Sequence, residues 1–271
     1  MSITFSSCFY IIHSKFNPGV YIEWMTNFIS IVNHFNLVIY TDEHSRAYIP
    51  NTLSNPRITI IVKPMHTFHN YQYKDSWISN HARNILLNNK SGWELNMLWS
   101  EKTRFVKQTM NQKYYDTEFY GWCDIGYFRN RSCDTPISDL ATNWCRNPAP
   151  IVHTKIYYAC ILTENDKHYM QNLHRIVNTK NEKGLSSMEI PADQNSIAGG
   201  FFIAHKSNID WWCDTFDATL RRYFDNQYLV KDDQIILVDC ILSAENAHRF
   251  YILQENIPRL DNWFLFQRFL N

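Results

Sequence analysis

The stretch Phe119-Tyr-Gly-Trp-Cys-Asp-Ile-Gly-Tyr-Phe-Arg129 decides the fold that this sequence predicts. Aromatic and strand-forming residues lead to a single carboxylate, Asp124, and Gly126 follows two residues later. A strand that ends at an acid can hold a divalent cation against a diphosphate, because the strand fixes the carboxylate and the glycine lets phosphates approach the backbone. The alternative is an ordinary strand with a polar end at a turn, since a lone carboxylate is a weak motif.

The sequence before this stretch alternates between strand and helix patterns. In chain order, the predicted elements are a strand, a helix, two strands, two helices and a strand: Ile3–Ile12, Val20–His34, Asn36–Tyr40, Arg57–Val62, 75–89, 94–111 and 118–123. This order is typical of an α/β fold with a single mixed, mostly parallel sheet flanked by helices.

Polar residues follow three of these strands, at the edge of the sheet where ligands of such folds bind. His13, Ser14 and Lys15 follow the first strand, Asp42 follows the second, and Asp124 follows the last. We expect these three positions to bind a base, a ribose and a phosphate–metal group.

The second half of the chain is less regular. Its predicted elements are a helix, a strand, two helices and a strand: about 166–178, Gly199–Ala204, about 207–224, one starting near Lys231, and Phe250–Leu253. The polar segment Asn178–Met188 is predicted to be a mobile loop that closes over the ligand-binding edge of the sheet when a ligand binds there. Neither a Gly/Ser linker nor an internal repeat is present, so we expect one domain over residues 1–271.

The composition narrows the function. Lys plus Arg and Asp plus Glu number 26 each, so no net charge draws the protein to nucleic acid or to anionic lipid. Aromatic residues make up 15% of the chain, which suits a surface that handles carbohydrate as well as it suits a large hydrophobic core. The seven cysteines show no zinc-binding spacing and are expected to be reduced, and neither a signal peptide nor a transmembrane segment is expected. We therefore expect a cytoplasmic protein.

Three further groups of residues accompany Asp124. Lys102 lies on a predicted helix, where its cation either neutralises a phosphate or faces solvent. The pair Gly199-Gly200 precedes a strand, where a side chain would block a sugar ring, although a tight turn accounts for the same residues. The run Asp232-Asp233-Gln234 opens an apolar helix and provides either paired acids for chemistry or a helix N-cap.

Taken in order, these motifs resemble an A-type glycosyltransferase fold, a Rossmann-like nucleotide-diphospho-sugar transferase. A Trp-x-Asp-x-Gly version of the usual Asp-x-Asp motif ends a strand, small residues at 198–200 begin another, and an Asp-Gln pair at 233–234 opens a helix. More narrowly, the chain resembles the HtrL/YibB-like (WlaTC/HtrL) glycosyltransferase family over residues 3 to 253. The resembling residues are Trp99, Lys102, Phe119, Tyr120, Trp122, Asp124, Gly126, Phe128, Arg129, the Gly-Gly-Phe-Phe at 199–202, and Asp232, Asp233 and Gln234.

The resemblance implies a hexosyltransferase-like enzyme that moves a sugar from a nucleotide-diphosphate donor to a glycan or another hydroxyl acceptor, with retention favoured over inversion. It implies a nucleotide-binding lobe at 1–130 and an acceptor or sugar lobe at 131–271. The implied catalytic residues are Asp233, Gln234 and Asp232. The substrate- or nucleotide-binding residues among those that resemble the family are Lys102, Trp122, Asp124, Gly126, Arg129, Gly199 and Gly200, and the positions after the first two strands add His13, Ser14, Lys15 and Asp42.

Asp124 is also the implied ligand of Mn²⁺ or Mg²⁺. Gly126 stands where the second carboxylate of the usual pair would be, so the ion has one ligand fewer. Such enzymes often have a metal-binding histidine near the C-terminus, but His248 is the one late histidine here, and its place before the last strand predicts a surface residue. Two other functions fit the same residues: an inactive sugar- or protein-binding module on this fold, and a nucleotidyltransferase or metal-dependent phosphohydrolase.

Overall fold

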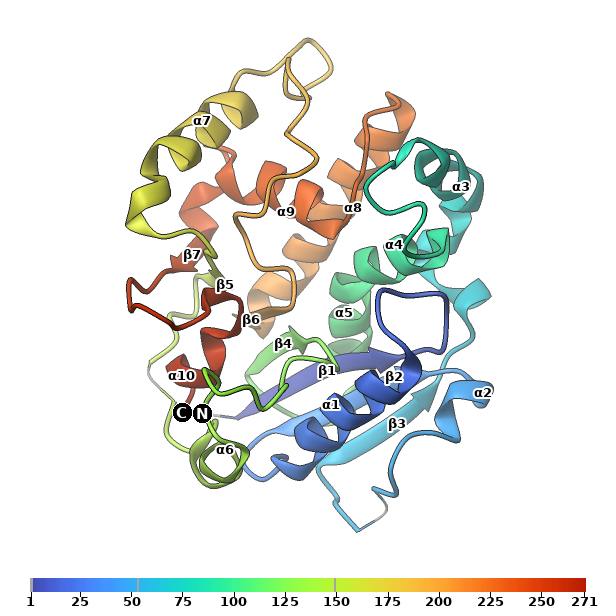
Figure 1. Ribbon diagram of the computed structural model, residues 1–271, viewed down its shortest axis with the longest axis vertical. Helices are drawn as coiled ribbons and strands as arrows, with labels where there is room; N and C mark the ends of the chain where they lie inside the picture. Colours follow the sequence, from blue (N-terminus) through green and yellow to red (C-terminus); the bar gives the residue numbers. More distant parts are fainter. Residues whose placement is uncertain (1, 53, 149) are drawn as a thin grey trace.

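The computed structural model describes residues 2–52, 54–148 and 150–271. A seven-stranded sheet in the order β3-β2-β1-β4-β6-β5-β7 runs through the molecule (Figure 1). Its strands are β1 (Ile3–Phe9), β2 (Asn36–Thr41), β3 (Ile58–Val62), β4 (Phe119–Cys123), β5 (Ile156–Ala159), β6 (Phe201–His205) and β7 (Phe250–Leu253). Strand β6 is antiparallel to both of its neighbours, β4 and β5, and the other pairs are parallel. The predicted α/β fold with one mixed, mostly parallel sheet is confirmed.

Helices cover both faces of this sheet. The α-helices of the described residues are α1 (Pro18–Ser30), α2 (Glu43–Arg46), α3 (Lys74–Arg83), α4 (Trp93–Ser100), α5 (Lys102–Gln112), α6 (Ile137–Asn143), α7 (Lys167–Asn178), α8 (Ile209–Asp225), α9 (Asp233–Leu242) and α10 (Phe266–Phe269). The short 3₁₀ helices are η1 (Met65–Thr67), η2 (His69–Tyr73), η3 (Glu164–Asp166), η4 (Lys206–Asn208), η5 (Ala247–Arg249) and η6 (Asn262–Phe264). None of the described helices is long and apolar enough to cross a membrane.

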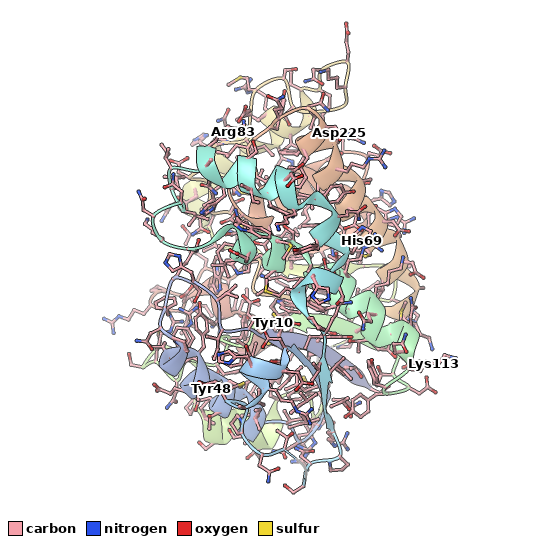
Figure 2. All side chains as sticks on the ribbon, turned by 90° about the vertical axis from the view of Figure 1, so that its right-hand side faces the viewer. Tyr10, Tyr48, His69, Arg83, Lys113 and Asp225 are labelled. Atoms are coloured by element: carbon pink, nitrogen blue, oxygen red, sulfur yellow. The ribbon has the colours of Figure 1, made fainter. Side chains whose placement is uncertain are left out.

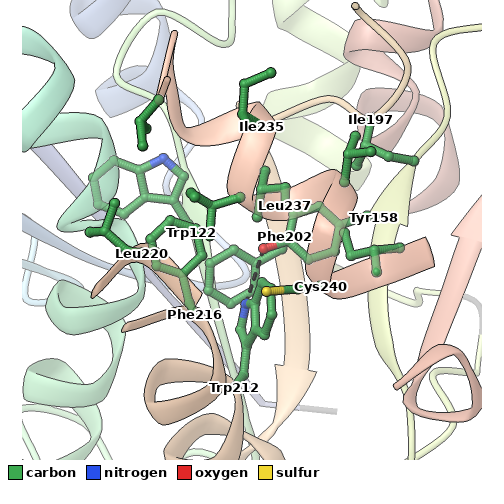
Figure 3. Close-up of a cluster of buried hydrophobic side chains, with 14 of the residues drawn as sticks. Trp122, Tyr158, Ile197, Phe202, Trp212, Phe216, Leu220, Ile235, Leu237 and Cys240 are labelled. Atoms are coloured by element: carbon green, nitrogen blue, oxygen red, sulfur yellow. Dashed lines mark hydrogen bonds between the residues drawn. The ribbon is translucent and has the colours of Figure 1, made fainter. Parts of the chain in front are cut away.

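Two hydrophobic cores lie on opposite faces of the sheet, because successive strand side chains point to opposite faces. Trp122 of β4 and Phe202 of β6 belong to the core that α5, α8 and α9 cover. Their neighbours Cys123 and Phe201 belong to the core that α1, α6 and α10 cover. Figure 3 shows part of the first core, in which the indole N–H of Trp212 on α8 donates to the Tyr158 hydroxyl at 3.0 Å. The first core lies directly beneath the candidate site.

Polar contacts fasten α3 to the segment between α8 and α9. Figure 2 shows Arg83, at the end of α3, on the same side of the molecule as Asp225, at the end of α8. Arg83 donates to the backbone carbonyl of Gln227 at 2.9 Å, and Asn80 of α3 donates to that of Val230 at 2.8 Å. These bonds anchor the segment that leads from α8 into α9.

Three helices differ from their predicted extents, of which α1 ends at Ser30 and not at His34. The helix predicted at 94–111 is two helices, α4 and α5, separated at Glu101, whose buried carboxylate accepts from the backbone N–H groups of His69 and Asn70. The helix predicted at 75–89 ends at Arg83, because the backbone of Asn84 turns away and its side chain donates to the carbonyl of Lys231 at 2.8 Å. Strand β5 was not predicted.

The polar segment Asn178–Met188, predicted to be a mobile loop, is exposed over most of its length but has two buried residues, Leu185 and Ser186. Leu185 is fully buried, and Lys180 and Ser186 form an antiparallel bridge. Lys180 also pairs with the buried carboxylate of Asp239 on α9. These contacts fasten the segment to the helical layer, and none of its residues lines the cavity described below.

Candidate functional site

A cavity of about 480 Å³ opens at the carboxyl ends of β1 and β4. Its volume lies in the range of small-molecule sites, and its place agrees with the usual site of α/β sheets. The lining residues on which the argument depends are Ser14, Lys15, Phe16, Tyr21, Trp99, Lys102, Trp122, Asp124, Gly126, Arg129, Gly199, Asp232, Asp233, Gln234, Asp261, Trp263 and Phe264.

The direction of β6 brings its glycines to the same edge as Asp124. Asp124 follows the carboxyl end of β4, and its backbone N–H donates to the carbonyl of Gly200 at 2.9 Å, just before β6 begins. A Cβ at Gly200 would lie 3.2 Å from Asp124 Oδ2, and a Cβ at Gly199 would lie 2.9 Å from Asp233 Oδ2. A larger residue at position 199 would press on the Asp233 carboxylate, and one at position 200 would fit tightly against Trp263 and Asp124.

The ammonium of Lys102 joins the two principal acids of the site. Its Nζ lies 3.1 Å from Asp124 Oδ1 and 3.0 Å from Asp233 Oδ2, and it donates to the carbonyl of Gly199 at 2.8 Å. Lys102 is the first residue of α5, which packs against β1 and β4. Only 9% of its side chain is exposed, so water screens these pairs weakly.

Trp122 fixes the orientation of Asp124. Its indole N–H donates to Asp124 Oδ1 at 2.6 Å, while its ring is stacked on Phe105 of α5. Asp124 Oδ2 makes no hydrogen bond with the part of the chain that the structure describes. Trp122 thus orients the acid, and one carboxylate oxygen stays open toward the cavity.

The protonation of Asp233 is set by its surroundings. Burial raises the pKa of its carboxyl to about 6 against the opposing effect of Lys102, and the neighbouring carboxylates of Asp232 and Asp124 add to the rise. Burial also lowers the pKa of Lys102, but Asp124 and Asp233 outweigh it and hold this pKa above the ordinary value of lysine. Near neutral pH the lysine is charged, and Asp233 can exchange a proton.

The three residues at the start of α9 have different roles. Asp232 is the N-cap, accepting from the backbone N–H of Gln234 at 3.2 Å, and its other oxygen pairs with Lys231 at 2.7 Å. Gln234 lines the cavity but gives its amide hydrogens to the Ile197 carbonyl at 2.7 Å and to Asn195 Oδ1 at 3.1 Å. Of the three, Asp233 alone faces Lys102.

The residues predicted after β1 and β2 divide into two groups. Ser14 and Lys15 line the cavity, and the Lys15 ammonium lies 4.7 Å from the centre of the Trp99 ring. His13 and Asp42 do not line it. Asp42 instead caps α2, accepting from the backbone N–H of Ser45 at 2.6 Å. A polar residue after a strand can serve the next helix as well as a ligand.

Gly126 makes room for an aromatic ring. A Cβ at this position would lie 2.7 Å from Trp24 of α1. The guanidinium of Arg129 lies between two rings, 4.3 Å from the centre of Trp24 and 5.0 Å from that of Phe264, and its Nε donates to the Gly126 carbonyl at 3.0 Å. Arg129 is therefore held in one orientation at the cavity wall.

Sequence reasoning missed the contribution of the C-terminal segment. Asp261, Trp263 and Phe264 line the cavity, with Arg131 paired to both Asp134 and Asp261. The available signal was a run of acid and aromatic residues after the last strand. His248 is exposed in η5, as predicted.

The Lys102 ammonium determines how a divalent cation would be held at this site. The space between the two principal acids is taken by the Lys102 ammonium. A Mn²⁺ or Mg²⁺ ion would have Asp124 Oδ2 as its protein ligand and would depend on phosphate oxygens for the rest.

The seven cysteines all carry free thiols, and Cys133 is the only one of them that is not buried.

No protein-family model matches the sequence, and no curated protein matches it.

Proposed function

We propose that this protein is a glycosyltransferase that moves a sugar from a nucleotide-diphosphate donor to a hydroxyl group of a glycan or another acceptor. The observation that supports this most is the meeting of Lys102, Asp124 and Asp233 beside Gly199 at the wall of one cavity. These residues come from separate segments, and they are the ones that the resemblance to A-type glycosyltransferases places around the donor.

Transfer needs a stabilised diphosphate leaving group and space for a sugar ring. As the glycosidic bond breaks, negative charge grows on the diphosphate, and fixed cations lower the barrier where that charge develops. Lys15 and Arg129 line the cavity without a carboxylate partner among the described residues, and Lys102 lies at its base. The cavity of about 480 Å³ offers space for a sugar ring next to Asp233, which lines it.

Asp233 is the best-placed general base. Its Oδ2 is held by Lys102, and its Oδ1 makes no hydrogen bond within the described residues. Its pKa, raised by burial to about 6, suits proton transfer near neutral pH. A base at this position supports inversion, whereas retention would need Gln234 to support an ion-pair intermediate, and its amide hydrogens are already donated. We therefore propose the inverting route in place of the retaining one.

The test is a panel of nucleotide sugars with candidate acceptors, followed by mass spectrometry for products and by NMR for anomeric configuration. The wild-type protein should consume one donor, and Asp233→Asn should lower turnover by about 100-fold or more, the range lost with a general base. Asp210→Asn, on the exposed face of α8, is the matched control. If no nucleotide sugar is consumed and none raises the melting temperature, the proposal is wrong.

A sugar-binding module without turnover is the second candidate. It is favoured by the ion pairs of Lys102, which engage both acids before any ligand arrives. Such a module would be stabilised by a sugar or nucleotide sugar but would release no nucleotide. Hydrolysis of the donor in the absence of an acceptor would instead support a phosphohydrolase.

A further inference from the structure

We infer that this cavity binds a diphosphate through two of the protein's own cations, Lys15 and Arg129, while Lys102 serves as the counterion of Asp124 and Asp233, and that it needs no divalent metal ion to do so. The inference rests on the proposed function for the identity of its ligand, a nucleoside diphosphate. It departs from the metal-assisted donor binding that the motif at Asp124 resembles.

The first argument is the position of Lys102. An ammonium has three hydrogens to donate, and here three oxygens surround Nζ at 2.8 to 3.1 Å: the Gly199 carbonyl, Asp233 Oδ2 and Asp124 Oδ1. A metal ion shared by the two acids would have to displace this buried cation. Removing one charge from a buried pair is strongly unfavourable, so the resident lysine serves as the counterion.

The second argument is the wall at Gly126, where the usual motif has its second carboxylate. Any side chain here would meet Trp24, since a Cβ would lie 2.7 Å from its ring. The same ring supports Arg129 at 4.3 Å. The site therefore excludes an acid from this position and presents a cation beside it.

The third argument is the geometry of Arg129. Its Nε is fixed to the Gly126 carbonyl, and its plane lies between Trp24 and Phe264. Its two terminal nitrogens make no hydrogen bond within the described residues, so they are free to bind an oxyanion in the paired manner typical of arginine. Lys15, placed over Trp99, provides a second unpaired cation.

The pairing of charges at the cavity leaves two cations for an anionic ligand. Each of the four acids that line the cavity is paired with a lysine or an arginine. Lys15 and Arg129 also line it and have no carboxylate partner among the described residues. These two unpaired cations favour a diphosphate without help from a metal ion.

The experiment is calorimetric titration of UDP and GDP into protein freed of metal by chelation, repeated with EDTA and with Mn²⁺. We expect the same dissociation constant under both conditions. Arg129→Gln and Lys15→Gln should each weaken binding by about 10-fold, as expected for the loss of a charge-assisted hydrogen bond. Lys206→Gln, at an exposed site on η4, should change nothing. Arg129→Lys separates charge from geometry and should recover only part of the affinity.

The outcomes separate this inference from the proposed function. Binding that requires Mn²⁺ and disappears in EDTA would overturn the inference and leave a metal-dependent glycosyltransferase. Metal-free binding that survives both Arg129→Gln and Lys15→Gln, with circular dichroism showing folded variants, would overturn the assignment of these cations. Failure of every nucleotide to bind with or without metal would overturn both proposals.

Discussion

Replacing Lys102 by Met keeps the length of the side chain and removes the charge that joins Asp124 to Asp233. Three interactions of the ammonium are lost together: the two ion pairs at 3.1 and 3.0 Å and the hydrogen bond to the Gly199 carbonyl. The result is two acids at the edge of one cavity with no cation between them. Stability and its dependence on pH should both respond.

The magnitude follows from the exposure of the two acids. Removing one partner of a buried ion pair costs about 3–5 kcal/mol. The Asp124 side chain is 33% exposed, so water compensates part of its loss, whereas the Asp233 side chain is 8% exposed. Asp233 can also lose its unpaired charge by binding a proton, and each unit by which its pKa shifts corresponds to about 1.4 kcal/mol. We therefore expect a loss near the lower end of that range, about 3 kcal/mol at about pH 7.5.

The sign of the pH dependence follows from the raised pKa of Asp233. In the folded wild type this pKa is about 6, above its ordinary value of 3.8, so the stability that protonation contributes is present at low pH and is lost as the pH rises through 6. Lys102→Met removes the cation that lowers this pKa, so the pKa rises further. The stability of the variant therefore continues to fall with pH to a higher pH than that of the wild type. The difference between the two proteins should therefore shrink to about 1–2 kcal/mol at about pH 5, where both bind the proton.

Urea unfolding at both pH values measures this difference. The matched control is Lys107→Met, which removes pairs to the exposed acids Asp210 and Asp214 on α8. It should cost less than about 1 kcal/mol, as surface pairs do. A loss from Lys102→Met that is no larger than the control, or that does not change with pH, would refute the electrostatic account of the site.

Three further predictions concern neighbouring contacts. Gly126→Ala should lower the free energy of unfolding by about 1–3 kcal/mol, because its Cβ meets Trp24 at 2.7 Å. Adding Trp24→Ala to this variant should remove most of that loss, and additive losses in urea unfolding would contradict the contact. Asp232→Ala should cost about 1–2 kcal/mol through loss of the α9 cap, and an unchanged melting temperature would argue against that role. Burial raises the pKa of Glu101 from 4.5 to about 6, so the stability that its protonation contributes is present below pH 4.5 and is lost as the pH rises through 6. Glu101→Gln should remove about 2 kcal/mol of this fall in the free energy of unfolding. A free energy of unfolding that depends on pH as in the wild type would contradict this prediction.

Most strands of this fold could be predicted because their apolar runs are local signals. The run at Ile3–Phe9 is buried along its whole length, and β2 is buried over all but its first residue. The short strand β5 was missed, since four residues give too brief a pattern. The separation of α4 from α5 could not be foreseen either, because Glu101 is held by backbone groups of His69 and Asn70, which lie far away in sequence.

Most residues of the candidate site could be predicted, but the contacts between them could not. Lys102, Asp124, Asp233 and Gly199 do meet at one cavity, whereas Gly200 lies behind Asp124 and does not line it. Lys102 was expected to face a phosphate, yet its ammonium is engaged by the protein's own acids. The aromatic rings of Trp24 and Phe264 around Arg129 come from opposite ends of the chain. Spacing along the sequence does not predict contacts between residues so far apart.

The antiparallel direction of β6 is the feature that permits a site of this composition. If β6 ran parallel to β4, its glycines would lie at the far edge of the sheet, about 16 Å away for a five-residue strand. Lys102 and Asp233 are the first residues of α5 and α9. The positive end of a helix dipole favours the acid there and disfavours the lysine by about 0.3–1 kcal/mol. A cation at that position is tolerable only because Asp124 and Asp233 surround it, and such a local conflict, compensated by its neighbours, is expected at a functional site.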